Sequence, residues 1–473
     1  IMEGYFDNPL ASIDMNDVAN ITILKDGTAL YGSRGANGVI LITTKRGRSQ
    51  ATQIEGNAYT GFNEKPKLPE MMNAEQFRRY ASNLVIDDPN YSDYESVTWL
   101  KNTELIYRDG RPTNMQQYKS FTNETDWADE VYRNTFLQSY SIAVNGGDES
   151  ALYNLSVGYT NSPSTLKNSS FSRLNARFNS DIQMFSRLAM AVDISYSQTD
   201  RTAPNDGAPA DYTTDPVTSV GYLSLIKAPF LSPYQYTRDG YLSSNYSDAD
   251  VFGLSNPTAL LDEDNNRYKN EANHVNITAT PKLDIGYGLE LSSKFSYTLD
   301  KTVEAYFRPR LGSPDFDRGT GTLASSTVKS LSAKQISIFS DTRLNWKKSF
   351  NQHNLDLLLG YRYTYDQYQS DWVRADNTAN DHINTITASL PNRVADGVDD
   401  RVKTAALYFN ADYNWLNRYF LTGTLSFDTS TRFGSEVDGA VHMGDHSWGF
   451  FPSIQGGWII SNEPFMKNVD FLS

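Results

Sequence analysis

Long stretches in which apolar and polar residues alternate one by one constrain the fold of this chain more than any other feature. Successive side chains of a β-strand point to opposite faces, so such alternation indicates a strand with one apolar and one wet face. In residues 172–183, for example, Leu174, Ala176, Phe178 and Ile182 alternate with Arg173, Asn175, Arg177, Asn179 and Asp181. The pattern predicts about twelve strands of about 9 to 14 residues, the length that a tilted strand needs to cross a bilayer.

The connections between these segments alternate between short and long. Short turns are expected near Gly146, Ser186, Tyr287, Asn351 and Asn417. Long excursions, which we expect to be extracellular loops, cover residues 62–136, 199–272, 301–333, 366–402 and 429–447. Short turns on one side and long loops on the other are typical of an outer-membrane β-barrel.

Aromatic residues on the apolar face separate this barrel from a soluble β-sandwich. Five are expected at the long-loop ends of their strands and three at the short-turn ends. The first group is Tyr159, Tyr196, Tyr297, Tyr365 and Phe427, and the second is Trp346, Trp415 and Trp458. Two aromatic girdles at the two interfaces are typical of membrane barrels, whereas a sandwich would have no reason to sort aromatics by height.

Composition excludes several other classes. The 473 residues include 42 basic and 56 acidic ones, a net charge of −14 that argues against a nucleic-acid binder. The absence of cysteine excludes disulfide scaffolds, thiolate metal sites and cysteine nucleophiles. An aromatic content of 13% is too high for a disordered chain. No apolar run approaches the roughly 18 residues of a spanning helix.

Residues 1–47 differ from the rest and are expected to form a small α/β or β unit. Short strands are predicted around 21–24 and 39–44, with a glycine-rich turn between them. A phosphate-binding loop would need a helix after Gly32, Gly35 and Gly38, but a strand follows, so the glycines are assigned a structural role. We expect Arg34, on this turn, to pair with a carboxylate of the barrel wall.

This turn also carries a family resemblance. Lys25-Asp26, followed by the unbroken string from Ala29 to Lys45, closely resembles the plug-domain signature of SusC/RagA-type TonB-dependent transporters of Bacteroidetes. The signature residues are Lys25, Asp26, Tyr31, Gly32, Arg34, Gly35, Asn37 and Gly38. Further matches run to the other end of the chain, where Glu463-Pro464-Phe465-Met466 is the last.

The resemblance implies an all-β membrane protein, a 22-stranded antiparallel transmembrane β-barrel with a small α/β plug in its lumen. Residues 1–50 would be the C-terminal part of the plug, and residues 51–473 the N-terminal part of the barrel. Because Ile1 is not an initiator methionine, we expect the chain to be an internal piece of a larger precursor.

The resemblance also implies a function, the active import of an oligosaccharide or peptide across the outer membrane of a Gram-negative bacterium. The implied partners are outer-membrane lipid, a SusD-like surface lipoprotein acting as a lid, and TonB, which would pull on a segment that this chain lacks. Association of two transporter–lid pairs is left open. The alternatives are a passive outer-membrane porin and a soluble carbohydrate-binding β-protein.

Candidate contact residues are five tyrosines in the loop 199–272. They are Tyr222, Tyr234, Tyr236, Tyr241 and Tyr246. Phenol rings suit stacking and hydrogen bonding to a sugar or peptide, but also packing within the loop or against a lid.

We predict no resident cofactor, no metal site and no enzymatic activity, because no catalytic motif occurs. His442 and His446 stand four residues apart, but in a glycine-containing loop without the glutamate of a zinc-enzyme motif. Asp262, Asp264 and Asn266 resemble the start of an EF-hand loop but lack its glycine and final glutamate, which leaves only adventitious calcium binding.

Overall fold

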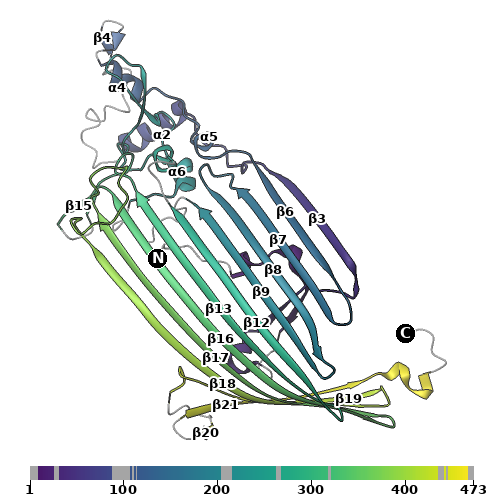
Figure 1. Ribbon diagram of the computed structural model, residues 1–473. Helices are drawn as coiled ribbons and strands as arrows, with labels where there is room; N and C mark the ends of the chain where they lie inside the picture. The colour runs from purple at the N-terminus through teal and green to yellow at the C-terminus, as the bar shows by residue number, and fades with distance from the viewer. Residues whose placement is uncertain are drawn as a thin grey trace.

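The computed structural model describes residues 9–25, 31–87, 107–108, 111–112, 114–203, 216–262, 268–317, 321–434, 441–443 and 446–466. Its main element is a curved antiparallel sheet of 13 strands (Figure 1). Twelve of them pair with their neighbours in chain order, and the short β20 (Val441–Met443) adds to β21 at one edge. The twelve are β3 (Gln50–Asn63), β6 (Thr135–Gly147), β7 (Ala151–Pro163), β8 (Ser170–Phe185), β9 (Leu188–Thr202), β12 (Lys269–Gly286), β13 (Leu289–Arg308), β16 (Thr327–Phe350), β17 (His353–Asp376), β18 (Val394–Trp415), β19 (Tyr419–Ser430) and β21 (His446–Trp458). The expected sheet of about twelve barrel strands is confirmed, and within the described residues it is a wall with two open edges.

Every predicted short turn lies at the same end of the wall. Two of them have consecutive residues with positive φ, Tyr287 (57°) with Gly288 (84°) and Leu416 (60°) with Asn417 (51°). Positive φ at both central residues is the geometry of the tight hairpin turn that matches the twist of the flanking strands. These turns fix the register of β12 against β13 and of β18 against β19.

The strands extend further on the long-loop side than their sequence pattern indicates. They range from the 12 residues of β19 to the 24 of β16 and β17, against an expectation of 9 to 14. Two of the expected loops are therefore too wide. Strands β13 and β16 extend into the range 301–333 and are connected by residues 309–326. Strands β17 and β18 extend into the range 366–402 and are connected by residues 377–393. The reason is that these outer extensions do not keep one apolar face toward lipid: polar residues lie on both faces, and the apolar Phe307, Val328 and Ala375 are buried in a cluster with the loop residues Ile386 and Leu390. Strand pairing continues where the apolar–polar alternation has ended.

A layer of packed loops covers the long-loop end of the wall (Figure 1). Its helices are α2 (Ala74–Asp87), α4 (Met115–Ser120), α5 (Trp127–Val131), α6 (Val220–Ile226) and α7 (Pro257–Leu260). Small hairpins accompany them: β4 (Tyr107–Arg108) with β5 (Arg111–Pro112), β10 (Tyr234–Tyr236) with β11 (Leu242–Tyr246), and β14 (Phe316–Asp317) with β15 (Leu323–Ala324). One apolar cluster joins Val131, Val220, Leu223 and Leu260, so the loops have a core of their own.

The N-terminal unit lies on the inner side of the wall (Figure 1). It comprises η1 (Pro9–Ser12), η2 (Met15–Asp17), β1 (Val18–Leu24), η3 (Gly32–Gly35) and β2 (Val39–Thr44). β1 and β2 pair antiparallel, as the sequence predicts. A short segment then leads directly from β2 into β3.

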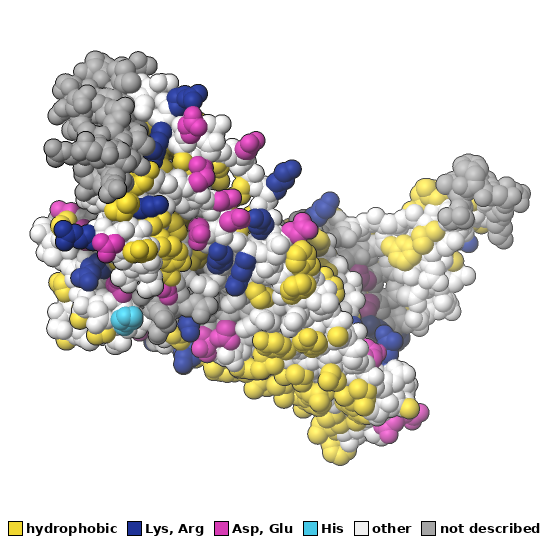
Figure 2. Space-filling model, turned by 90° about the horizontal axis from the view of Figure 1, so that it is seen from above, with side chains coloured by type: hydrophobic (Ala, Val, Ile, Leu, Met, Phe, Trp, Pro, Cys, Tyr) yellow, Lys and Arg dark blue, Asp and Glu magenta, His cyan; other side chains and the backbone are white. Residues whose placement is uncertain are grey.

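Hydrophobic side chains gather on the outer flank of the wall when it is seen from above, whereas charged ones are spread over the loop layer (Figure 2). Large exposed apolar residues include Leu359, Leu407 and Ile338, which share this outer face. Among the described helices, none is both long and apolar enough to cross a membrane.

Candidate functional site: the plug and its wall

The N-terminal unit, hereafter the plug, is attached to the wall through charged side chains. Asp14 caps the first turn of η2, and its carboxylate lies 3.6 Å from Arg173 on β8. Asp17 lies 3.4 Å from Arg177 and also accepts a hydrogen bond of 2.6 Å from Ser156 on β7. Both aspartates are buried. Because side chains alternate between the two faces of β8, both arginines point inward, and the polar face of this strand binds the plug.

A second attachment lies where the plug continues into the wall. Arg46 donates two hydrogen bonds of 2.9 Å to Asp181 on β8 and a third of 2.9 Å to Asp193 on β9. Two parallel bonds to one carboxylate exploit the planar fork of the guanidinium, which holds the geometry more tightly than a single contact would. Next to it, Asn179 donates to the backbone carbonyl of Lys45 at 2.7 Å.

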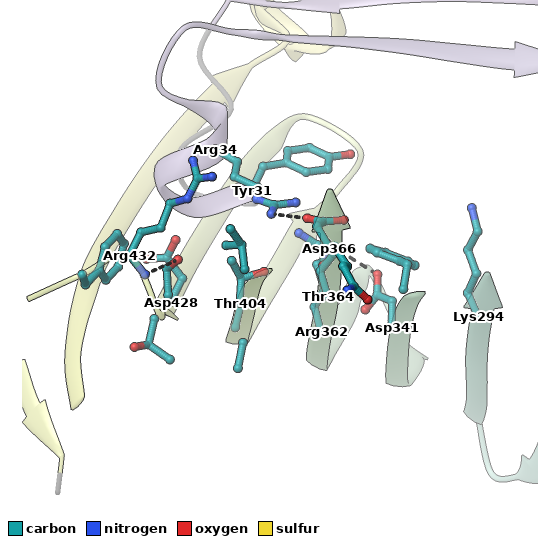
Figure 3. A pocket seen from close by; sticks show the side chains of 18 of the residues that line it. Tyr31, Arg34, Lys294, Asp341, Arg362, Thr364, Asp366, Thr404, Asp428 and Arg432 are labelled. Carbon is teal, nitrogen blue, oxygen red and sulfur yellow. Dashed lines mark hydrogen bonds and ion pairs between the residues drawn. The ribbon is translucent and has the colours of Figure 1, made fainter. Parts of the chain in front are cut away.

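The signature turn makes the third attachment (Figure 3). Arg34 forms an ion pair of 2.8 Å with Asp366 on β17, which confirms the expectation that this residue pairs with a wall carboxylate. The guanidinium of Arg362 lies 5.2 Å from the centre of the Tyr31 ring, within the range of a cation–π contact. Gly32 has φ of 61° and faces β19 so closely that a Cβ would lie 2.3 Å from the Asp428 carboxylate. Glycine adopts this backbone angle without strain, and its lack of a side chain leaves room for the carboxylate.

The remaining signature residues are placed around this turn. Lys25 is exposed just after β1, and Asn37 is exposed before β2. Gly35 is buried, and Gly38, with φ of 92°, donates its N–H to the Gly35 carbonyl at 3.0 Å. Asp26 lies outside the described residues.

A cavity of about 720 Å³ separates the signature turn from the wall (Figure 3). Tyr31 and Arg34 of the plug line one side, and inward residues of β13 to β19 line the other, including Lys294 and Thr404. The cavity is therefore bounded by both parts, and any displacement of the plug would change it.

On the wall beside this cavity lies a charged cluster that the sequence analysis missed. Asp341, which is buried, accepts hydrogen bonds from Tyr408 at 2.5 Å and from Arg343 at 2.6 Å, and lies 3.5 Å from Arg362. Arg362 in turn contacts the ring of Tyr31, so the cluster connects three wall strands to the plug. Inward position on long strands is the only signal that could have indicated it, because the register that brings these side chains of three successive strands together cannot be read from the sequence.

The structure separates the five loop tyrosines into two groups. Tyr234 and Tyr246 stack on each other with ring centres 5.4 Å apart, and Tyr236 donates to Asn123 at 2.7 Å. These contacts lie within the loop layer. Tyr222 on α6 and Tyr241 at the tip of the β10–β11 hairpin are exposed, Tyr241 with 74% of its surface accessible. A role for any of them in binding a ligand or lid stays a prediction.

At the short-turn end, the predicted tryptophans lie close to strand ends. His353, Trp415, Tyr419 and Trp458 stack in succession, with ring centres 5.2 to 6.3 Å apart. Trp346 lies on the neighbouring strand β16, where its Nε1 donates to the Tyr287 carbonyl at 3.3 Å. His353 and Tyr419 were missed because the sequence analysis considered only the tryptophans at this level.

The aromatics expected at the long-loop ends do not all lie at strand ends. Tyr297 and Tyr365 lie near the middle of β13 and β17, because these strands continue to Arg308 and Asp376. Tyr196 also lies near the middle of β9, whereas Tyr159 and Phe427 lie nearer the ends of β7 and β19. The expected position at the strand ends is therefore wrong for the mid-strand tyrosines. A membrane girdle formed by the five aromatics stays a prediction.

Neither candidate metal motif is supported by a cluster of ligands. His442 and His446 are exposed in the β20–β21 hairpin. Asp264 and Asn266 of the calcium motif lie outside the described residues, while Asp262 follows α7. Within the described part of the chain, no group of three or more metal-ligating side chains comes together.

These features define a class: a transmembrane strand wall with long loops on one side and a plug bound to its inner face. Solved structures share this fold. The RagAB peptide importer in its open-open state aligns with a TM-score of 0.75 at 17% identity, over 97% of this chain and 50% of that chain. The ferric citrate transporter FecA aligns with a TM-score of 0.52 at 9% identity, over 95% and 49%. At these identities the likeness shows the fold.

Sequence relatives narrow the class further. The chain is 26% identical to the TonB-dependent receptor SusC of Bacteroides thetaiotaomicron over 98% of its own length and 43% of that protein. It is 24% identical to the TonB-dependent receptor P3 of Formosa agariphila over 96% and 40%. No protein-family model matches. The resemblance to SusC/RagA-type transporters is confirmed, the location is the outer membrane, and the chain spans about two fifths of the length of these curated relatives.

Proposed function

We propose that the protein to which this chain belongs imports a large nutrient, an oligosaccharide or a peptide, with energy delivered through TonB. The single observation that carries the proposal is the plug held in the wall by ion pairs at three separate places. A filled lumen passes nothing large, so the plug must move or unfold locally, and a passive pore has no use for such an attachment. The proposed role is transport rather than catalysis.

We further propose that the loop layer receives a SusD-like lipoprotein as a lid. What supports this is the internal packing of the loops: they have their own apolar clusters and therefore offer a formed surface at the mouth of the wall. The exposed Tyr222 and Tyr241 are the loop tyrosines best placed for such contact or for substrate. One structural relative is a peptide importer, and the oligosaccharide alternative comes from the family resemblance of the sequence.

The decisive experiment locks the plug to the wall. Because the chain has no cysteine, the double variant Gly32→Cys/Asp428→Cys would carry the only two thiols in these 473 residues. A Cβ at Gly32 would lie 3.2 Å from that of Asp428, slightly inside the usual disulfide spacing, and the substitution removes the carboxylate that would clash. We expect uptake to stop under oxidising conditions and to return on reduction.

A matched control cross-links the wall to itself. Ser293 and Thr342 are direct partners on β13 and β16, and their hydroxyls lie 2.8 Å apart. Ser293→Cys/Thr342→Cys should leave uptake intact in both redox states. Uptake that continues through the oxidised Gly32–Asp428 variant would refute plug displacement and favour a passive pore.

A further inference from the structure

The outer face of the wall changes from apolar to polar toward the loops on four adjacent strands. The apolar outward residues next to this change are Leu299 on β13, Ile336 on β16, Tyr365 on β17 and Ala405 on β18, although Val303 on β13, nearer the loops, is again apolar. The next outward residues, two positions further along each strand toward the loops, are Lys301, Lys334, Gln367 and Lys403. Three of these four are lysines. The direction of these residues follows from their neighbours. Lys294 and Asp341 line the plug cavity and so point inward, and residues an odd number of positions away on the same strand point outward.

The change coincides with a membrane surface. From Leu355 to Tyr365 the outward residues of β17 are apolar or aromatic; ten residue steps cover about 33 Å of strand, or about 25 Å of height at the usual tilt. That is the height of the apolar band of an outer-membrane barrel. The Tyr365 hydroxyl donates to Gln367 at 3.2 Å, and the Tyr196 hydroxyl donates to Asn273 at 3.0 Å, so both phenols point out of the apolar band. The lysines therefore stand at the headgroups of the outer leaflet, on the long-loop side.

Two of the lysines face each other directly. Lys301 and Lys334 are cross-strand partners in a stretch of β13 and β16 without a register shift, and both are exposed. Partners of this kind have Cβ atoms about 4.5 to 5.5 Å apart, and like charges so placed are destabilising unless something offsets them.

The described residues offer these lysines no carboxylate within 4 Å. Glu271 lies opposite Val303 and Asp371 opposite Ser332, both one outward position further from the membrane. Glu271 accepts a hydrogen bond from Asn273 at 3.0 Å instead. By contrast, Arg401 on the same outer face is paired with Asp399 at 2.9 Å. The two ammonium groups thus present six N–H donors, and among the described residues neither forms an ion pair with the diagonal carboxylates of Glu271 and Asp371.

We propose that Lys301 and Lys334 clamp the phosphate of an anionic glycolipid in the outer leaflet. A phosphate placed between them offsets their mutual repulsion and accepts hydrogen bonds from both, while their methylene stems lie along Leu299 and Ile336. Lys403, two strands away, extends the positive level along the same headgroup layer. The inference uses only the membrane location and does not depend on which nutrient is imported.

The test measures lipid retention by the full-length protein. The protein is reconstituted in nanodiscs of neutral lipid with a trace of a phosphorylated outer-leaflet glycolipid, and retained glycolipid is counted by native mass spectrometry. A lysine beside an anionic headgroup contributes roughly a factor of five in binding, so Lys301→Gln/Lys334→Gln should weaken retention roughly 25-fold. Lys301→Arg/Lys334→Arg should retain the lipid, because the two charges remain.

The control variant is Lys282→Gln/Lys347→Gln, which makes the same charge change on the inner face of β12 and β16. Equal retention by the two double Gln variants would overturn the proposal, as would equal binding of the same glycolipid after its phosphates are removed. Displacement of the glycolipid by inorganic phosphate at millimolar concentration would also overturn it, since that result would indicate a site for free anions.

Discussion

A buried ion pair stabilises the loop layer, and removing it should loosen the loops while leaving the wall intact. Lys227, directly after α6, lies 2.6 Å from Asp250, with only 3% and 4% of the two side chains exposed. The ammonium also lies 5.3 Å from the centre of the Trp127 ring. Asp250 accepts two further hydrogen bonds of 2.9 Å from the backbone N–H groups of Phe252 and Leu254. The pair therefore connects α5, α6 and the segment that leads to α7.

Removing one partner leaves the other charge buried without compensation, which costs about 3 to 5 kcal/mol. We expect Lys227→Met to fall near the lower limit, because Asp250 keeps its two backbone donors. Asp250→Asn should cost more, because the ammonium keeps only the Leu254 carbonyl, at 3.4 Å, and the Trp127 ring. The double variant removes both charges, so its cost should be at least about 2 kcal/mol less than the sum of the single costs.

The pH dependence of the free energy of unfolding tests the same ion pair independently. Burial lowers the pKa of Lys227 even with Asp250 beside it. In Asp250→Asn the opposing charge is gone, so the folded-state pKa falls further below the unfolded value. A folded state that binds fewer protons gains stability as the pH rises. The cost of Asp250→Asn should therefore shrink as the pH rises toward the ordinary lysine pKa of about 10.4, whereas the cost of Lys227→Met should not.

Hydrogen exchange measures these costs locally. Amides of α5, α6 and α7 should exchange faster in the single variants, and amides of β16 and β17 should be unchanged, because the wall does not depend on the pair. The reasoning fails if the single costs add within about 0.5 kcal/mol in the double variant, which would mean that the two charges do not interact.

Three further predictions concern the plug and the short-turn end of the wall. Arg46→Gln removes three charge-assisted hydrogen bonds and should lower the urea concentration at which the reconstituted wall begins to conduct; unchanged conductance would show that these bonds do not hold the plug. Gly47→Ala should prevent correct seating of the plug, since a Cβ would lie 2.3 Å from the backbone nitrogen of Tyr153, and limited proteolysis between plug and wall should then accelerate. Hydrogen bonds from Tyr419 and then Trp458 lower the pKa of Glu463, so their contribution is present above its unfolded pKa and is lost as the pH falls through the lower folded value. Trp458 emission, isolated by difference from Trp458→Phe, should shift in that acidic range and should lose the shift in Glu463→Gln.

The sequence predicts those parts of the fold in which one face of a strand meets lipid. There, apolar residues must alternate with polar ones, and the tight turns at the short-turn end have recognisable chemistry at Tyr287 and Asn417. Beyond the apolar band β17 meets water and packed loop residues instead of lipid, so no regular apolar–polar alternation after Tyr365 distinguishes a continued strand from a loop. The extent of the outer strands comes instead from the pairing of neighbours, which a single sequence does not reveal.

Some contacts of the candidate site could also be predicted from the sequence, and others could not. Arg34 could be predicted to meet a wall carboxylate because a cation on a turn inside a barrel needs a partner, but the identity of Asp366, 332 residues away, could not. Arg46 and the buried Asp341 gave no local signal at all. The partners of Arg46 and the neighbours of Asp341 occupy inward positions on strands that come together only when the wall forms.

The kind of contact, more than the number of contacts, explains how a plug can be both secure and removable. The plug is held at all three places by polar groups, so its departure exchanges ion pairs for water and exposes little apolar surface. Partly exposed pairs such as Arg34–Asp366 contribute at most about 1 kcal/mol each, and a pulling force can break them one after another. The pairs of Asp14 and Asp17 are more deeply buried, with side-chain exposures of 4% and 8%, and should release last. The loop layer has apolar clusters and a buried ion pair instead, so under the proposed import mechanism the force that moves the plug leaves the loops in place to support the lid.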